Sequence, residues 1–496
     1  METTANTVKN DIEDFLKDTG FEATIGLEVH CELKTATKLW CSCKNSFGNE
    51  PNTLVCPVCL GLPGSLPVLN KKAVEYAIRI GLALNCTVQN SIFHRKNYFY
   101  PDMPKDFQIS QYDIPINADG YVTLPDGGSV GIVRAHIEED TGKSTHFSAS
   151  GRIHESSATL IDYNRAGIPL VEIVSAPDIT SSEMAKAYVT ELRNIIVATG
   201  ATDGKMEEGS MRVDANVSVK RIQDSELGTR CEIKNLNSLR SLSRAINYEI
   251  KRQVDNILSG QKVVQQTRHF NEDLNQTVTL RTKEEAEDYR YFPEPDLVPL
   301  NPGAAWIEQI KAEMPPLLIE RRRIVQDLMR DSQEIDQLQS AIAILVDLNL
   351  DSVFKQTVGI GANPTITLKR LTNEAANAVE AARNLNPEQF AKLIQMETDN
   401  KISTTQSKTI LSKMLENPDK TLDILISELS IVSFGEAETT ALVEQLIKDK
   451  PDEFERFKQG DDKVTQFFIG QIMRLSKGQA NGKLVTEILM KKRNQF

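Results

Sequence analysis

The sequence predicts an α+β fold with a mixed or antiparallel sheet in its first part and only helices in its second part. Short β-like runs fill residues 23 to about 300. They do not alternate regularly with the helical patterns between them, which disfavours a doubly wound parallel sheet. Pro293, Pro295, Pro299, Pro302 and Gly303 then fall within eleven residues. Such a stretch breaks regular structure and indicates a domain boundary, after which almost every pattern is helical.

Each expected element depends on a local pattern of apolar residues. Strands are expected at residues 23–33, 121–124, 130–139, 159–163, 170–174, 211–219 and 230–233. Helices are expected at 71–84, 181–199 and 239–258, the last with one apolar stripe that includes Leu242, Ile246 and Ile250. Beyond the boundary, amphipathic helices are expected at 319–328, 335–348, 372–384, 387–396 and 404–415.

The 496 residues suffice for about three domains at roughly 150 residues each. We expect an N-terminal extension over 1–20, a sheet domain over 21–298, a helical domain over 299–415 and a helical tail over 416–496. Weak turn signals near 398–403 and 417–420 indicate the last division.

Charge and hydropathy exclude several classes of protein. The net charge of −12 excludes a wholly basic nucleic-acid wrapper, but it leaves room for a local basic patch. No apolar run reaches the ~18 residues that a membrane span needs. The acidic first 22 residues fit neither a signal peptide nor a transit peptide. We therefore expect a cytoplasmic protein without a membrane partner.

The last 26 residues form a basic end on this acidic protein. One acidic side chain, Glu487, is outnumbered by six basic ones: Arg474, Lys477, Lys483, Lys491, Lys492 and Arg493. A phosphate-backbone contact and an ordinary solvated helix face explain this pattern about equally well.

Four of the seven cysteines cluster as Cys41-x-Cys43 and Cys56-x-x-Cys59. In a large chain without a secretion signal, such clustering indicates a metal site rather than disulfides. Thiolates bind Zn²⁺ tetrahedrally, and four of them close its coordination shell, so we expect a structural zinc. The alternative is four reduced thiols without a metal.

Carboxylates on apolar strands form a second candidate cluster. Glu28 and His30 are two residues apart on one predicted strand and therefore point to the same face. Glu139 and Glu172 each share a face with apolar residues on another predicted strand. Burying such a carboxylate costs free energy unless it is paired with a cation or bound to a metal. Mg²⁺ prefers carboxylate oxygens as ligands and tolerates an imidazole. A salt bridge or a strand-edge charge explains each residue taken singly, so only their convergence would favour a magnesium site.

Basic and aromatic residues lie beside turn formers between residues 95 and 105. Lys96, Tyr98 and Lys105 belong to this group, which suits either phosphate contacts or an exposed loop with an aromatic anchor. The GxxxxGK[ST] loop does not occur in the sequence, so a P-loop enzyme is excluded.

A polar face is expected on the strand that begins near Ser210. Arg212, Asp214 and Asn216 alternate along it and point to one side. That face either meets solvent or lines a nucleotide cleft.

Six longer motifs resemble, in order, those of the B-subunit family of aspartyl/glutamyl-tRNA amidotransferases. They are IGLEVH (25–30), RKNYFYPD (95–102), HIEEDTGKSTH (136–146), MEEGS (206–210), EIKNLNS (232–238) and DYRYFPEPD (288–296). The resemblance runs from about residue 21 to the C-terminus and leaves 1–20 as an extension.

The resemblance implies a ligase that works in a complex of three subunits. An A-type amidase subunit hydrolyses glutamine, and the pair is braced by a small C-type subunit. The B-type subunit uses ATP and Mg²⁺ to phosphorylate the side-chain carboxylate of Glu on tRNA(Gln) or of Asp on tRNA(Asn), and ammonia then displaces phosphate. The fold implied is a cradle similar to glutamine synthetase and guanido kinases, followed by a helical domain and a YqeY-like tail that grips tRNA. A noncatalytic tRNA-binding scaffold is the alternative.

The same resemblance implies roles for individual residues. The Mg²⁺ ligands would be Glu28, His30, Glu139 and Glu172, with Glu138 as the alternate ligand. Catalysis would involve Glu139, Lys96, Tyr98 and Lys105, the last three near the site and the mouth of the ammonia channel. The motif assigned to ATP holds Ser210, Arg212, Asp214 and Asn216. Zinc cysteines occur in part of the family and match Cys41, Cys43, Cys56 and Cys59.

Overall fold

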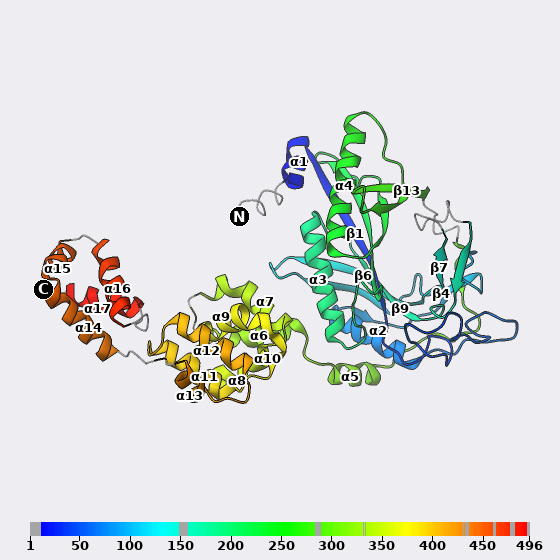
Figure 1. The fold of residues 1–496 in the computed structure, drawn as a ribbon. Coiled ribbons are helices and arrows are strands. Elements are labelled where there is room, and N and C mark those ends of the chain that lie inside the picture. The colour runs from blue at the N-terminus through cyan, green and yellow to red at the C-terminus, as the bar shows by residue number, and fades with distance from the viewer. Residues whose placement is uncertain are drawn as a thin grey trace. The chain divides into compact units, whose positions relative to one another are not determined.

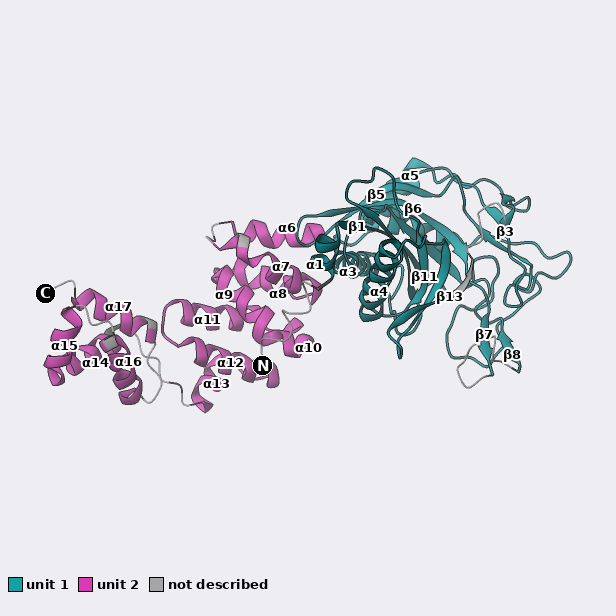
Figure 2. Ribbon diagram, turned by 90° about the horizontal axis from the view of Figure 1, so that it is seen from above, with its two compact units in different colours: residues 1–317 teal, residues 318–496 magenta. Residues whose placement is uncertain are grey.

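The computed structural model of the protein describes residues 11–147, 157–282, 289–330, 332, 334–429, 431, 436–459, 463–476 and 482–493. The chain divides into two compact units, residues 1–317 and 318–496 (Figure 2). Residues 1–10 of the predicted extension lie outside the described residues, and helix α1 (Asp11–Thr19) follows them. Helix α5 (Ala304–Glu313) belongs to the first unit, because its Ile310 lies in that unit's core. The predicted divisions after residues 298 and 415 stay predictions.

A mixed sheet forms the centre of the first unit (Figure 1). Its main path runs β13–β12–β11–β10–β1–β9–β6–β4–β3–β14, β5 pairs with β6, and β2 pairs with β5. Neighbours on the path are antiparallel except β11 and β12, which are parallel, so the predicted mixed or antiparallel sheet is confirmed as mixed. The strands are β1 (Phe21–Glu32), β2 (Thr87–Val88), β3 (His94–Asn97), β4 (Phe107–Ser110), β5 (Asn117–Thr123), β6 (Ser129–Glu139), β9 (Pro169–Ser175), β10 (Met211–Arg221), β11 (Cys231–Leu236), β12 (Gln266–Asn271), β13 (Gln276–Thr282) and β14 (Phe292–Pro293). A separate two-stranded ribbon pairs β7 (Lys143–His146) with β8 (Thr159–Asp162).

The two faces of the sheet differ because apolar and polar residues alternate along its strands. In β1, Ile25, Leu27 and Val29 are buried in the hydrophobic core. Glu28 and His30 alternate with them and point to the opposite face. The apolar face is thus available for helices, and the polar face for a site.

Three helices supply the other side of this core: α2 (Lys71–Ala83), α3 (Ser182–Ala198) and α4 (Leu239–Leu258). Each begins after a residue whose side-chain oxygen accepts backbone hydrogen bonds from the first turn, namely Asn70, Ser181 and Ser238. All three predicted helices are confirmed to within one residue at each end.

The second unit is helical. Its α-helices are α6 (Leu318–Leu328), α7 (Gln339–Asp347), α8 (Asp351–Gly359), α9 (Pro364–Lys369), α10 (Val379–Arg383), α11 (Pro387–Thr398), α12 (Thr404–Glu416), α13 (Leu422–Glu428), α14 (Glu436–Asp449), α15 (Pro451–Lys458), α16 (Lys463–Leu475) and α17 (Gly482–Arg493). Short turns of other helix types are η3 (Ile335–Leu338), η4 (Arg370–Glu374) and η5 (Ala375–Ala378). The last four helices share one apolar cluster that includes Val443, Phe457, Phe468 and Val485.

The helix predicted over 372–384 is interrupted. A π-helical turn and a 3₁₀ turn lead to Ala378, whose backbone (φ −138°, ψ 54°) leaves the helical region before α10 begins. Arg370 at the π turn pairs with Glu374 and Glu397, and this buried network is a contact that the apolar pattern does not encode.

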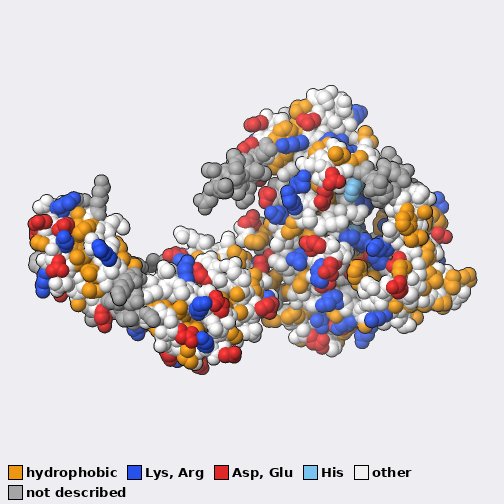
Figure 3. Space-filling model, viewed as in Figure 1, with side chains coloured by type: hydrophobic (Ala, Val, Ile, Leu, Met, Phe, Trp, Pro, Cys, Tyr) orange, Lys and Arg blue, Asp and Glu red, His pale blue; other side chains and the backbone are white. Residues whose placement is uncertain are grey.

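Acidic and basic side chains are interspersed over the visible face of both units (Figure 3). Among the helices of the described residues, none combines the length and the apolarity needed to cross a membrane.

Candidate functional site

A cavity of about 590 Å³ opens on the polar face of the sheet. Residues of β1, β3, β4, β6, β9, β10 and β11 line it, together with the chain just before β14. Seven of the residues predicted for the site line this cavity: Glu28, His30, Lys96, Tyr98, Glu172, Arg212 and Asp214. The structure therefore brings together side chains from motifs almost 190 residues apart in sequence.

The register of the sheet aligns the polar side chains in rows. His30 of β1 lies opposite Glu172 of β9, and Glu172 in turn lies opposite His136 of β6. On the other side of β1, Glu28 lies opposite Asp214 of β10. Directly opposed side chains on one face of a sheet are ~5 Å apart, so the pairing itself concentrates these groups.

One row forms a group that suits a divalent cation. The His30 Nε2 atom lies 3.4 Å from Glu172 and 3.6 Å from Glu138, and the three ligand atoms lie within 4.8 Å of one another. Burial alone would lower the pKa of His30, but the hydrogen bond and charge of Glu172, with the charge of Glu138, raise it to about 9. Burial and then Glu172 raise the pKa of Glu138 to about 7.

The excess of acceptors in this row is the observation that fits a bound metal. The carboxylates of Glu138 and Glu172 lie in a buried setting where their mutual repulsion is strong. His136 is also buried, burial lowers its pKa to about 4, and its Nδ1 atom has no partner among the described residues. A hard cation such as Mg²⁺ would offset the negative charge, and His30, Glu138 and Glu172 would hold it.

A second acidic group lies beside the first. Glu28, Asp214 and Glu232 also place their ligand atoms within 4.8 Å, and Lys234 Nζ lies 3.0 Å from Asp214 and 2.9 Å from Glu232. Neutral donors fix one oxygen of each carboxylate: Asn216 on Glu28, Asn235 N–H on Asp214 and Thr267 on Glu232. Despite burial, Lys234 and His30 lower the pKa of Asp214. The charge of Lys234 thus offsets part of the charge of this second group.

Basic and aromatic side chains complete the walls of the cavity. Arg134 lies 3.8 Å from Glu172, and Arg212 lies 3.2 Å from Asp140. Lys96 Nζ lies 4.7 Å from the ring centroid of Tyr289. A polyphosphate with its bound metal requires both basic side chains for the phosphate oxygens and carboxylates for the metal, and this cavity offers both.

Glu139 does not line this cavity, in contrast to the prediction that it is a metal ligand and catalytic residue. Consecutive strand residues point to opposite faces, so Glu138, the alternate ligand, faces the cavity and Glu139 faces away. The Glu139 carboxylate pairs with Lys105 and accepts a hydrogen bond from the Ile109 N–H. Lys105, predicted to be catalytic, is likewise absent from the cavity lining.

Ser210 and Asn216 of the predicted ATP motif also lie outside the lining of the cavity. Ser210 donates to Asp203 and accepts from the Lys205 N–H, so it closes a local turn. Asn216 contacts a residue of the cavity lining, because its amide donates a hydrogen bond to Glu28 over 2.9 Å.

A smaller cavity of about 160 Å³ lies on the other face of the same strands. Along β4, Phe107 and Ile109 line the small cavity, and Gln108 and Ser110 line the large one. Lys105 lines the small cavity just before β4. β4 therefore separates the two cavities.

The four predicted zinc ligands converge. The Sγ atoms of Cys41, Cys43, Cys56 and Cys59 all lie within 4.8 Å of one another. The Cys56 N–H donates to Cys59 Sγ over 3.0 Å, and the Cys56 and Cys59 sulfurs are 3.8 Å apart. Ligands ~2.3 Å from a tetrahedral metal are roughly 3.8 Å apart, so this arrangement fits a thiolate-bound zinc.

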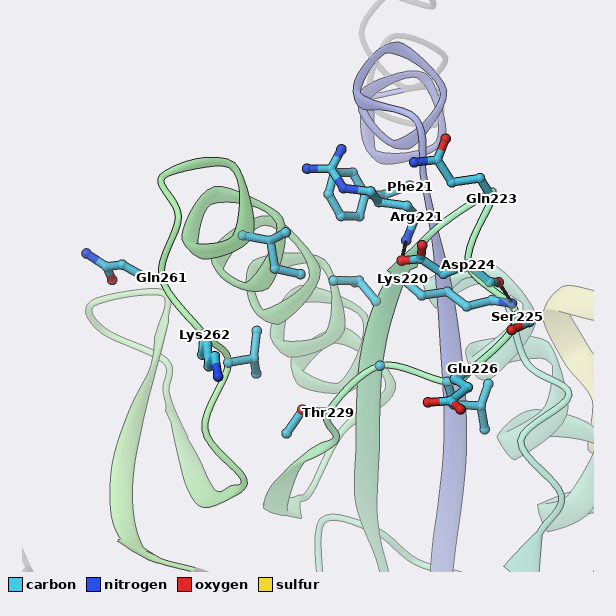
Figure 4. A pocket seen from close by; sticks show the side chains of 15 residues that line it. Phe21, Lys220, Arg221, Gln223, Asp224, Ser225, Glu226, Thr229, Gln261 and Lys262 are labelled. Carbon is cyan, nitrogen blue, oxygen red and sulfur yellow. Dashed lines mark hydrogen bonds between the residues drawn. The ribbon is translucent and has the colours of Figure 1, made fainter.

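A third cavity, of about 690 Å³, lies where β1 begins and β10 ends (Figure 4). Phe21 at its wall is seven residues before Glu28, which is roughly 23 Å along a strand. One of its basic residues, Lys220, already pairs with Glu22 at 3.0 Å. None of the predicted site residues lines this cavity.

Sequence reasoning gave no role to several cavity residues, among them Arg134, His136, Glu232, Lys234 and Tyr291. Glu232 and Lys234 are two residues apart on β11, so strand alternation would have placed them together. Tyr291 lacked a local signal, because only the pairing of β14 with β3 brings it next to Tyr112, 4.2 Å away between ring centroids.

Two family models match most of the chain. Residues 23–308 match the GatB/GatE catalytic domain, and residues 352–492 match the GatB domain. Two similar relatives are named as B subunits of aspartyl/glutamyl-tRNA(Asn/Gln) amidotransferases. The one from Thermoanaerobacter pseudethanolicus is 43% identical over 95% of this chain and 98% of the relative. The one from Thermobifida fusca is 43% identical over 95% of this chain and 94% of the relative. With its first domain and nearly its whole length matched, the chain belongs to the family of aspartyl/glutamyl-tRNA amidotransferase B subunits.

Proposed function

We propose that this chain activates the side-chain carboxylate of Glu on tRNA(Gln), of Asp on tRNA(Asn), or of both, as the ATP-dependent ligase subunit of an amidotransferase. The observation that carries the proposal is the cross-strand row of His30, Glu172 and His136, with Glu138 beside it, in one cavity with basic residues. Relatives that are 43% identical over 95% of this chain are named as subunits of tRNA amidotransferases.

The chemistry explains why such a row is needed. A carboxylate is a poor electrophile, so one of its oxygens first attacks the γ-phosphorus of ATP, and the bond to the β-phosphate oxygen breaks to release ADP. Ammonia then attacks the carbonyl carbon of the acyl phosphate, loses a proton, and expels inorganic phosphate to leave the amide. Both steps place negative charge on phosphate oxygens, and preorganised cations stabilise it.

Named side chains support each part of this scheme. His30, Glu138 and Glu172 would hold Mg²⁺, which when bound neutralises charge on the phosphates. Arg134 and Lys96 line the same cavity and would orient the phosphoryl group. Arg212 and Asp214 would contact the nucleotide, as predicted for the ATP motif, with Asn216 holding Glu28 in place.

The proposal also includes the partner subunits, the tRNA-binding helices and the zinc. Ammonia would come from an A-type amidase subunit, and a small C-type subunit would complete a heterotrimer in the cytoplasm. The helices of residues 416–496 would bind the tRNA, and Zn²⁺ at the four cysteines would be structural.

The test uses the reconstituted complex with ammonium chloride in place of glutamine, together with ATP, Mg²⁺ and Glu-tRNA(Gln). Wild type is compared with Glu172→Gln, at the centre of the row, and with Glu183→Gln, an exposed carboxylate on α3. Phosphate release, amide formation and tRNA binding are measured for each.

We expect Glu172→Gln to lose phosphate release and amide formation together while tRNA binding persists, and Glu183→Gln to behave like wild type. Full activity in Glu172→Gln would contradict the proposal. The chain would then be a noncatalytic tRNA-binding scaffold within the same complex.

A further inference from the structure

The backbone after the last cysteine packs directly on Lys105. Gly61 has φ +63°, and a Cβ atom added there would lie 2.4 Å from Lys105 Cγ and 3.0 Å from its Cα. Only a residue without a side chain permits this approach. Gly61 is therefore the point where the loop that carries the cysteines touches the lysine.

A second contact links the cysteines to Glu139. A Cβ atom added to Gly167 would lie 3.8 Å from Cys59 Cβ and 3.9 Å from Glu139 Oε2, so these two side chains flank one glycine. Backbone hydrogen bonds continue the link: the Leu39 N–H donates to Gly167 O, and the Gly167 N–H donates to Asp140 O, next to Glu139. The cysteine loop thus borders both partners of one ion pair.

That ion pair depends on its surroundings. The side chains of Lys105 and Glu139 are 9% and 2% exposed, so water offers little compensation if they separate. The carbonyl of Glu139 also accepts from Gln108, which lines the large cavity. A shift of this ion pair would therefore move side chains on both faces of β4.

A metal at the cysteines would fix this geometry. It would join Cys41 and Cys43 to Cys56 and Cys59 across a loop of twelve intervening residues. Cross-linking the two ends of a loop restricts the backbone between and beside them. Gly61 follows Cys59 by two residues, so it lies within reach of that restraint.

We propose that the four-cysteine element, residues 38–61, is a positioning device for the Lys105–Glu139 pair, acting through Gly61 and Gly167. Metal bound to the cysteines holds the loop against Lys105. Loss of the metal releases the loop and opens the pair. The inference concerns the chain itself and goes beyond the proposed function.

The test is lysine acylation of the full-length chain, read by mass spectrometry, with Zn²⁺ bound and after its removal by a chelator. We expect Lys105 to be protected in the zinc form and to react at least ten times faster in the metal-free form. Lys72, which is 46% exposed, should react equally in both forms. Lys234, which is 33% exposed on the other face of the sheet, should also react equally in both forms, and a parallel rise at Lys234 would indicate that the whole domain has unfolded.

A matched pair of variants separates this contact from general loop strain. Gly61 and Gly64 both have positive φ in the same loop, but a Cβ atom at Gly64 would meet nothing within 4 Å. Gly61→Ala should increase the labelling of Lys105 at least fivefold with an unchanged zinc content. Gly64→Ala should carry the same backbone strain and leave the labelling unchanged.

Three results would overturn the inference: continued protection of Lys105 in folded metal-free protein, equal labelling in the two glycine variants, or thiols that bind neither Zn²⁺ nor Co²⁺. The labelling needs neither tRNA nor ATP. Its failure would therefore leave the proposed activation of the carboxylate untouched, and failure of that activation would leave this inference standing.

Discussion

Exchange of two adjacent carboxylates for amides should give opposite phenotypes. Glu138 lines the large cavity beside His30 and Glu172, whereas Glu139 lies on the other face and pairs with Lys105. We expect Glu138→Gln to abolish activity at little cost in stability. The main effect of Glu139→Gln should be a lower free energy of unfolding.

The magnitudes follow from burial and charge. Glu139→Gln leaves the Lys105 ammonium, 9% exposed, without its counter-charge, and breaking a buried pair in this way costs about 3–5 kcal/mol in general. The amide oxygen still accepts from the Ile109 N–H, so the lower end applies, about 3 kcal/mol. At ~2 °C per kcal/mol for a large domain, the melting temperature should fall by roughly 6 °C.

Glu138→Gln removes a buried charge that faces Glu172, so relief of repulsion offsets the lost contacts. We expect its melting temperature to change by less than about 2 °C. Its ammonium-dependent amide formation should fall ~100-fold or more if Glu138 holds the metal as proposed.

The assays are thermal unfolding of the chain alone and ammonium-dependent amide formation by the reconstituted complex. Adding Lys105→Met to Glu139→Gln should recover most of the lost stability, because no unpaired charge then remains buried. Unaltered activity in Glu138→Gln, or a Glu139→Gln variant that is inactive yet as stable as wild type, would refute the assignment of these residues to opposite faces.

Three other outcomes are expected. Lys234→Met should destabilise the metal-free protein by about 2 kcal/mol in thermal unfolding, because Asp214 loses its buried counter-charge. Added Mg²⁺ should restore part of that stability. Unchanged stability of the variant would show that the lysine does not balance the acidic group. Burial lowers the pKa of His94, so the unfolded chain binds its proton more readily and stability is lost as the pH falls below about 6.5; His94→Gln should flatten that loss in unfolding measured between pH 7 and pH 5, and an unchanged slope would contradict it. Lys491→Gln should weaken tRNA binding and reduce its salt dependence by about one phosphate contact. A point substitution is preferable to deletion of α17, because the deletion would also remove the buried Val485 and Ile488 and so destabilise the helices around them.

Strand alternation predicted much of the sheet. The residues 23–33 were expected to be a strand with Glu28 and His30 on one face, and β1 confirms both statements. The same reasoning placed Glu139 with apolar neighbours, and it is indeed buried, at 2% exposure. Burial was therefore predictable from the pattern, but both the pattern and the family resemblance also put Glu139 in the candidate metal group, and it lies outside the lining of the large cavity.

The strands that close the cavity could not be predicted in this way. β3 and β4 have four residues each, and β3 reads His-Arg-Lys-Asn, without an apolar alternation to recognise. β3 pairs with β4 on one side and, on the other, with β14, almost 200 residues later, where Arg95 binds Glu294. Lys105 lines the small cavity with Phe107 and Ile109 of β4, and the catalytic role expected for it came from the family resemblance rather than from a local pattern.

The division of neighbouring side chains between two cavities makes β6 sensitive to its length. An insertion or deletion of one residue before Glu138 would turn every later side chain of the strand over, because the pleat repeats every two residues. The carboxylate that now lines the large cavity would then face Lys105, and its neighbour would face His30. Substitutions in this strand damage one cavity at a time, whereas a frame-preserving loss of a single codon would disable both at once. Natural length variation is accordingly expected in the turn over residues 124–128, which precedes β6, rather than within the strand itself.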